Sequence, residues 1–207
     1  MVHGKVQLET VADTKCVLIV EKDAAYHRLI DEGFLDRFGP CIIITGKGYP
    51  DMNTRLLVHM IWSQLSLPIY ALVDADPFGI EIMCVYRYGS AKMAHLCNRL
   101  AVPSVRWLGI HPCDVTVLSP PGYASQQMTD KDKRRAEALL RRPYIACNDE
   151  IKRQVMPSTG DFQITNCGEK CDSLENQHLK KCQWNPCIII FLLLCPLNVT
   201  QPLRICC

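Results

Sequence analysis

The sequence predicts an α/β fold with a mainly parallel sheet of four strands flanked by helices. Short apolar runs rich in β-branched residues alternate along the chain with longer segments of helical periodicity. The runs are continuously apolar instead of alternating with polar residues, which is typical of strands covered on both faces. Buried strands that alternate with helices indicate βαβ units with right-handed crossovers.

The expected strands and helices follow one another in order from residue 16 onward. The strands are Cys16–Val20, Cys41–Thr45, 69–73 and 105–110. The helices are 24–34, a helix capped by Asp51 or Asn53, 80–88 and 129–142. The Gly-rich turn 46–50 closes the second strand, and the apolar residues of the helix that follows it recur at helical spacing.

The composition is that of a globular protein. Of the 207 residues, 48% are apolar and 21% are charged, close to the averages of soluble domains, which excludes wholesale disorder. The formal net charge of +2 excludes a polycation that binds nucleic acid by bulk attraction. Any nucleic-acid site therefore has to be local.

The 13 cysteines divide the chain into two parts. Six lie in the first 166 residues, mostly in apolar or helical surroundings where a thiol acts as a small hydrophobe, and seven lie in the last 41. We therefore expect a lead-in over 1–15, a reduced domain over 16–155 and an atypical, poorly ordered Cys-rich tail over 156–207. The apolar run 187–195 is too short to span a membrane, so no membrane association is expected.

Three carboxylates follow directly on predicted strands. Glu21 follows the first strand, and Asp74 and Asp76 follow the third. In a parallel sheet, ligands bind outside the carboxyl ends of the strands, and a few carboxylates together with substrate phosphates are what Mg²⁺ prefers. The alternative is that the two aspartates before Pro77 only form a turn and cap a helix.

Four ordered segments carry a resemblance to a known family: VLIVEKDAAYHRL, IIITGKGYPDMNTRLL, LVDADPFGIEIMCVYRYGS and VRWLGIHPCDV. They resemble the Toprim domain of the meiotic double-strand-break proteins related to the A subunit of topoisomerase VI. The resemblance covers roughly residues 16–155 and implies a Rossmann-like Toprim domain. It also implies a nuclear protein that cuts double-stranded DNA in meiosis, through attack of a tyrosine on a backbone phosphate.

The resemblance implies roles for the three strand-end acids. Glu21, Asp74 and Asp76 match the metal-binding acids of the family, with Mg²⁺ as the cofactor, and Glu21 can also serve as general acid or base. The implied partners are DNA, a second copy or a full-length family member that forms a dimer with this chain, and a topoisomerase VI B-like subunit.

Two basic features can contact DNA. Lys47 and Tyr49 lie in the Gly-rich turn after the second strand, at the same sheet edge as the acids, where a lysine can meet a phosphate and a ring can contact a base or sugar. A basic cluster on the helix 129–142 can follow the DNA backbone or simply be a solvated face. Its members are Lys131, Lys133, Arg134, Arg135, Arg141 and Arg142.

The chain also departs from the family pattern. The family's nucleophilic tyrosine lies in a winged-helix domain before the Toprim domain, and none of the seven tyrosines here matches it. We therefore expect this chain alone not to break DNA. The alternative function is that of a catalytically inactive isoform that binds DNA or a partner, and the tail that replaces the family's last helices suggests a truncated or alternatively spliced form.

Overall fold

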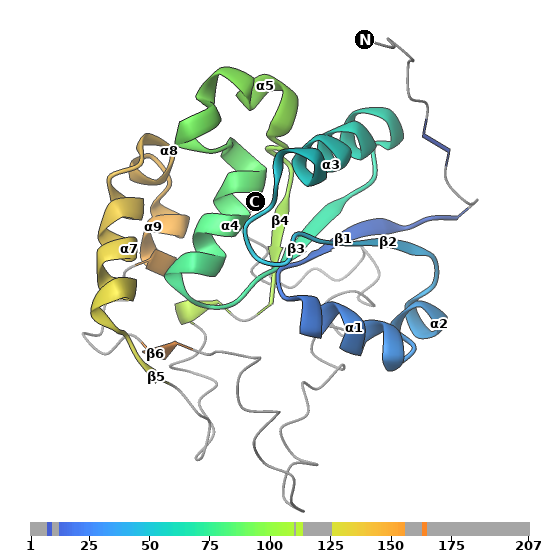
Figure 1. Cartoon of the computed structure of the whole chain (residues 1–207), viewed down its shortest axis with the longest axis horizontal. Coiled ribbons are helices and arrows are strands. Elements are labelled where there is room, and N and C mark those ends of the chain that lie inside the picture. The colour runs from blue at the N-terminus through green and yellow to red at the C-terminus, as the bar shows by residue number, and fades with distance from the viewer. Residues whose placement is uncertain (1–7, 10–12, 110, 114–125, 156–162, 165–207) are drawn as a thin grey trace, which may run out of the picture. The chain divides into compact units, whose positions relative to one another are not determined.

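The computed structural model describes residues 8–9, 13–109, 111–113, 126–155 and 163–164 (Figure 1). Its main sheet has four parallel strands in the order β2-β1-β3-β4, which confirms the predicted α/β fold. The strands are β1 (Cys16–Val20), β2 (Cys41–Thr45), β3 (Ile69–Leu72) and β4 (Arg106–Leu108). A small antiparallel pair joins β5 (Gln126–Gln127) to β6 (Gln163–Ile164). Most of the tail predicted over 156–207 lies outside the described residues.

Helices alternate with the strands of the main sheet. They are α1 (Asp23–Asp31), α2 (Phe34–Phe38), α3 (Met52–Leu65), α4 (Pro77–Tyr88), the 3₁₀ helix η1 (Ala91–Leu96), α5 (Cys97–Leu100), α7 (Asp130–Leu140), α8 (Pro143–Ala146) and α9 (Asp149–Val155). In the described part of the chain, none of these helices has the length and apolar character needed to cross a membrane.

The chain forms two compact units. The first contains Met1–Ala71 and Cys84–Arg106, and the second contains Leu72–Met83 and Trp107–Cys207. In the first unit, β1 and β2 pair in parallel, with Cys16 opposite Cys41. All five β1 residues are buried because helices lie on both sides of these strands, α1 and α2 on one side and α3 on the other (Figure 1). This is why the β1 sequence has no polar alternation.

The predicted helix over 24–34 corresponds to α1, which ends three residues earlier than predicted, and α2 after it was not predicted. α1 ends at Asp31, and Gly33 adopts a left-handed conformation with a φ of 69° before α2 begins at Phe34. Glycine adopts this conformation without the steric penalty of a Cβ atom, so it can end one helix and redirect the chain into the next. The redirection buries Phe34 and Phe38.

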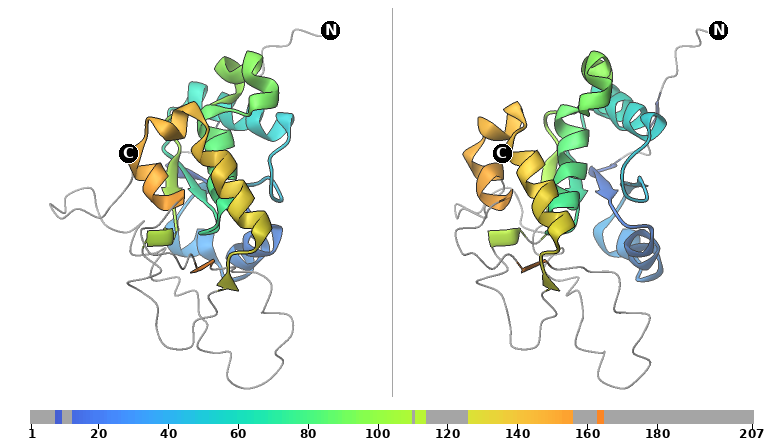
Figure 2. Two further views of the ribbon diagram at one scale, coloured as in Figure 1. Left: turned by 90° about the vertical axis from the view of Figure 1, so that its left-hand side faces the viewer. Right: turned by 60° about the vertical axis from the view of Figure 1, so that its left-hand side comes forward.

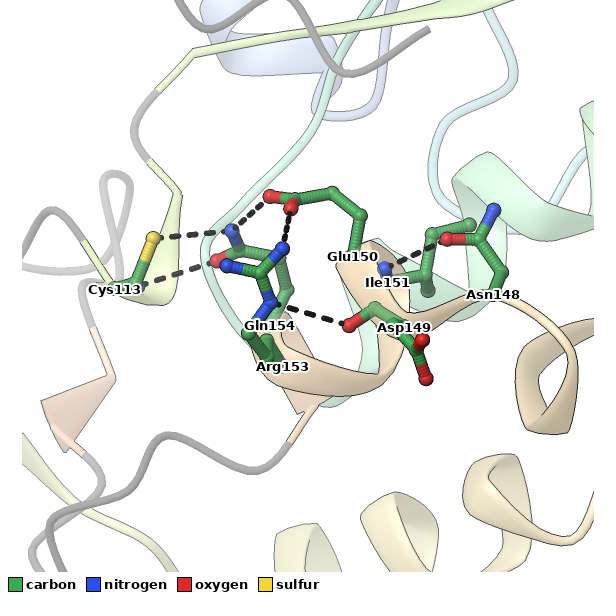
Figure 3. Close-up of polar contacts among 7 residues, drawn as sticks. All are labelled: Cys113, Asn148, Asp149, Glu150, Ile151, Arg153 and Gln154. Atoms are coloured by element: carbon green, nitrogen blue, oxygen red, sulfur yellow. Dashed lines mark hydrogen bonds and ion pairs between the residues drawn. The ribbon is translucent and has the colours of Figure 1, made fainter.

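In the second unit, α7 lies beside α4 in both views of Figure 2. A capping box begins α7 at Thr129, where the predicted helical segment also starts: the Thr129 hydroxyl accepts a hydrogen bond from the Asp132 N–H, and the Asp132 carboxylate accepts one from the Thr129 N–H. Figure 3 shows how α9 is held. The buried Gln154 accepts a hydrogen bond from the Cys113 N–H over 3.2 Å and donates one to the Cys113 Sγ over 3.0 Å.

Candidate functional site

Glu21 lies at the carboxyl end of β1, where the backbone joins it to the Gly-rich turn. The Glu21 carbonyl oxygen accepts a hydrogen bond from the Gly48 N–H over 2.9 Å. Gly48 has a φ of 100°, which favours glycine, and Lys47 before it has a φ of 52°. The turn is therefore anchored directly to the residue that carries a predicted metal ligand.

Lys47 and Tyr49 are both exposed on this turn. The Lys47 Nζ lies 3.4 Å from the Asp23 Oδ2, and the two side chains are 69% and 40% exposed. An exposed ion pair of this kind contributes only about 0–1 kcal/mol. The Tyr49 residue is 47% exposed. The structure therefore presents both predicted DNA-binding side chains to solvent, within a few residues of the β2 end.

A buried cation that the sequence prediction missed lies in α3. Arg55 is 2% exposed, and its Nη1 donates to the Ser90 Oγ over 3.4 Å. Among the described residues, its Nε and Nη2 and the Tyr86 hydroxyl have no hydrogen-bond partner. Burial lowers the pKa of Arg55 and raises that of Tyr86. The Tyr86 hydroxyl lies so close to Gly46 that a Cβ there would be 3.0 Å away, so Tyr86 packs against the first residue of the Gly-rich turn.

The second unit holds Asp74 and Asp76 around the start of α4. Asp76 is buried, and its Oδ1 accepts a hydrogen bond from the Gly79 N–H over 2.6 Å, so Asp76 caps α4, as the alternative interpretation of these aspartates expected. Asp74 is half-buried, and a Cβ on Gly79 would lie 2.3 Å from the Asp74 carbonyl oxygen. Both aspartates thus depend on Gly79, one through its N–H and the other through its missing side chain.

Glu81, one turn further along α4, is a second residue that the sequence prediction missed. It is 7% exposed, and its carboxylate pairs with two arginines of the predicted basic cluster: Arg135 Nη1 lies 3.0 Å from Oε2, and Arg142 Nη2 lies 3.6 Å from Oε1. These two arginines are therefore part of an ion-pair group within the second unit. A signal was present in the sequence, because an acid inside the apolar stretch of a helix requires cationic partners.

Glu21 comes directly after β1, whereas β3 ends one residue earlier than predicted, two residues before Asp74. Glu21 follows β1 and the two aspartates follow β3, and these strands are neighbours in the sheet. Across the described ranges, no group of three or more His, Cys, Asp or Glu side chains is arranged to hold a metal ion. The donor set fits Mg²⁺ chemically, because carboxylate oxygens in small number, completed by water and phosphate oxygens, are its usual ligands.

Comparison with known proteins finds relatives that all belong to one family. The family that comprises the Toprim domain of the topoisomerase 6 A subunit and of Spo11 matches residues 16–162. The meiotic recombination protein SPO11 of Homo sapiens is 50% identical over 145 residues, which cover 70% of this chain and 37% of that protein. The DNA topoisomerase 6 A subunit of Arabidopsis thaliana is 41% identical over 137 residues, which cover 66% of this chain and 32% of that protein.

The meiotic recombination protein W68 of Drosophila melanogaster is 41% identical over 137 residues, which cover 66% of this chain and 40% of that protein. The chain thus spans well under two thirds of the length of each of these relatives. The strand order, the strand-end acids and these matches agree, and the chain belongs through its Toprim domain to the family of Spo11 and the topoisomerase 6 A subunit.

Proposed function

We propose that this chain is the Toprim part of a meiotic recombination-initiating protein that makes DNA double-strand breaks by Mg²⁺-dependent tyrosyl transesterification. The observation that carries the proposal is the placement of the acids. Glu21 directly follows β1, and Asp74 and Asp76 lie in the segment between the end of β3, the neighbour of β1 in the sheet, and the start of α4. Ligands of parallel sheets bind at this edge.

The three acids have distinct proposed tasks. Asp74 and Asp76 hold Mg²⁺ together with Glu21, and the Gly79 N–H fixes one oxygen of Asp76 so that the carboxylate has a set orientation. The bound ion would stabilise negative charge on the DNA phosphate and on the departing 3′-oxygen. Glu21 additionally serves as general acid or base.

The Gly-rich turn is the proposed DNA contact. Lys47 exchanges its weak pairing with Asp23 for a DNA phosphate, because an exposed ion pair costs little to break. The exposed Tyr49 contacts a base or sugar. The hydrogen bond between Gly48 and Glu21 links this contact to the proposed metal site.

The proposal assigns the remaining parts of the reaction to partners. The nucleophilic tyrosine comes from a winged-helix domain, supplied by a second copy or by a full-length family member in a dimer. A topoisomerase VI B-like subunit completes the assembly, which acts in the nucleus. The names of the SPO11 relatives, which are meiotic recombination proteins, support the nuclear location.

The metal site is tested by thermal unfolding of the full chain in millimolar Mg²⁺ with a short DNA duplex. We expect Mg²⁺ to raise the midpoint by mass action, and we expect Asp74→Asn to abolish the rise. Asp36→Asn, which removes one exposed carboxylate from α2, is the matched control and should keep the rise. A wild-type midpoint that does not respond to Mg²⁺ in the presence of DNA contradicts the proposed metal site.

Incubation with supercoiled DNA and Mg²⁺ separates the enzymatic from the non-enzymatic role. We expect the chain alone to bind DNA without forming protein-linked ends, and we expect such ends once a family member with the tyrosine domain is added. A covalent adduct with the chain alone would place the nucleophile within these 207 residues. DNA binding with no adduct under either condition would favour the inactive, DNA-binding isoform.

A further inference from the structure

We propose that Glu81 is a positioning residue for the Asp74–Asp76 segment, and that α7 serves to hold it. This proposal rests on the proposed metal function of these aspartates. Glu81 lies in α4 five residues after Asp76 and does not belong to the predicted metal ligands. Its two carboxylate oxygens are each paired with a different guanidinium, at 3.0 Å to Arg135 and 3.6 Å to Arg142.

Side chains of α7 also contact the first turn of α4. The Phe78 ring, three residues before Glu81, has the Arg135 Cζ and the Lys131 Nζ each 5.1 Å from its centroid. Both distances are within the range of cation–π attraction. Arg135 thus contacts both the Phe78 ring in the first turn of α4 and the Glu81 carboxylate one turn further along.

The first turn of α4 is also the part that orients the aspartates. Phe78 lies between Asp76 and Gly79, whose N–H holds the Asp76 Oδ1 at 2.6 Å. Gly79 packs so closely on the Asp74 carbonyl that a Cβ would overlap it. A displacement of this turn therefore moves the Gly79 N–H away from Asp76 and changes its packing on Asp74.

The burial of Glu81 strengthens its ion pairs with Arg135 and Arg142. Its side chain is 9% exposed, whereas those of Arg135 and Arg142 are 37% and 30% exposed. Removing the carboxylate charge leaves the two arginines without their anion, and they then gain by turning toward water. Loss of the single buried carboxylate is thus expected to loosen the contact of α7 with α4 at both points.

The test compares Glu81→Gln with Glu137→Gln in the full chain. Glu137 is exposed on α7, so this control removes the same charge without touching the ion pairs. Hydrogen exchange of the Gly79 amide reports the bond to Asp76 without any metal, and a Mg²⁺ titration by calorimetry, with a short duplex present, reports the site itself. The hydrogen exchange and the Mg²⁺ titration are both measured under conditions in which circular dichroism shows that each variant is folded.

We expect Glu81→Gln to speed hydrogen exchange at the Gly79 amide and to raise the Mg²⁺ concentration at half-saturation about ten-fold, because residues that orient metal ligands contribute to metal affinity. Glu137→Gln should change neither quantity. Unchanged exchange at Gly79 overturns the proposal, whether or not Mg²⁺ binds. Faster exchange with an unchanged Mg²⁺ midpoint also overturns it, because α7 would then only brace the helix. If the wild type binds no Mg²⁺, the proposed metal function fails, and exchange at Gly79 alone decides whether Glu81 orients Asp76.

If Glu81→Gln does not fold, Arg142→Gln replaces it. The Arg142 side chain makes the longer of the two ion pairs, so its loss should have the same effect on Gly79 to a smaller extent. An exchange rate at Gly79 equal to that of the wild type in this variant overturns the proposal.

Discussion

Replacing Gly79 by alanine should destabilise the chain, although the same change in an ordinary helix stabilises it. The φ of Gly79 lies outside the left-handed region, so the backbone itself tolerates alanine there. Helix propensity alone therefore predicts a gain of about 1 kcal/mol. The added Cβ, however, would lie 2.3 Å from the Asp74 carbonyl oxygen and 2.9 Å from the Asp74 nitrogen.

The size of the loss follows from what can move. Both clashing atoms are backbone atoms, so relief requires a shift of about 1 Å in the first turn of α4 or in the segment that carries Asp74. Overpacking of this kind costs about 1–3 kcal/mol, which exceeds or cancels the helix gain. After the helix gain of about 1 kcal/mol is subtracted, we expect a net loss of up to about 2 kcal/mol, and a lower thermal midpoint by about 2–4 °C for each kcal/mol lost.

Urea unfolding followed by circular dichroism measures this change. Ala138→Gly, at an exposed position of α7, calibrates the helix propensity in the same chain and should cost about 1 kcal/mol. The sum of the two free-energy changes isolates the effect of the clash. A Gly79→Ala chain that is more stable than the wild type by the roughly 1 kcal/mol of the helix propensity would show that there is no clash and would refute the reasoning.

Three further predictions use other parts of the chain. Thr129→Ala should lose about 1 kcal/mol in urea unfolding because the capping box is lost, whereas Thr129→Ser should keep most of it; equal losses would contradict the cap. Burial, with the Cys41 thiol nearby, raises the pKa of Cys16 from 9.0 to about 12. The contribution of the protonated Cys16 thiol to the free energy of unfolding is therefore complete below pH 9 and is lost as the pH rises toward 12, because the unfolded chain loses this proton first. Cys16→Ala should therefore flatten the alkaline loss of stability by at most about 1.4 kcal/mol per pH unit, while the exposed Cys147→Ala should leave it unchanged; identical profiles would show that Cys16 does not titrate late. Lys47→Gln should weaken DNA binding in fluorescence anisotropy and lower the salt slope by about 1, and an unchanged slope would remove Lys47 from the interface.

Local pattern was enough for the strands and for one helix cap. Cys16–Val20 and Cys41–Thr45 are strands with the predicted bounds, because short apolar runs rich in β-branched residues favour strands. Burial of the whole strand, which was expected for both, is found in β1, whereas the residues of β2 at the sheet edge are only partly buried. Asp51 caps α3, as one of the two predicted candidates, because its carboxylate reaches the Thr54 N–H within one helical turn. Such interactions span a few residues and can be predicted from the sequence.

The end of α1 before Gly33 and the presence of α2 after it could not be predicted in this way. Apolar periodicity continues across this position, and only the left-handed φ of Gly33 shows that the chain turns there. Arg55 was missed for a related reason. It lies among the polar and apolar residues of an amphipathic helix, and its burial depends on the residues from 86 to 93 that pack over it.

The sequence by itself determined the family, the α/β fold and the three acids that follow β1 and β3, because these depend on local composition and on matching motifs. Only the tertiary structure decided what the basic residues of α7 do. The sequence left Arg135 and Arg142 equally suited to DNA and to solvent, and the structure pairs both with Glu81, which lies more than 50 residues earlier in the chain. An ion pair over that separation depends on how α7 packs beside α4, and local periodicity contains no information about that packing.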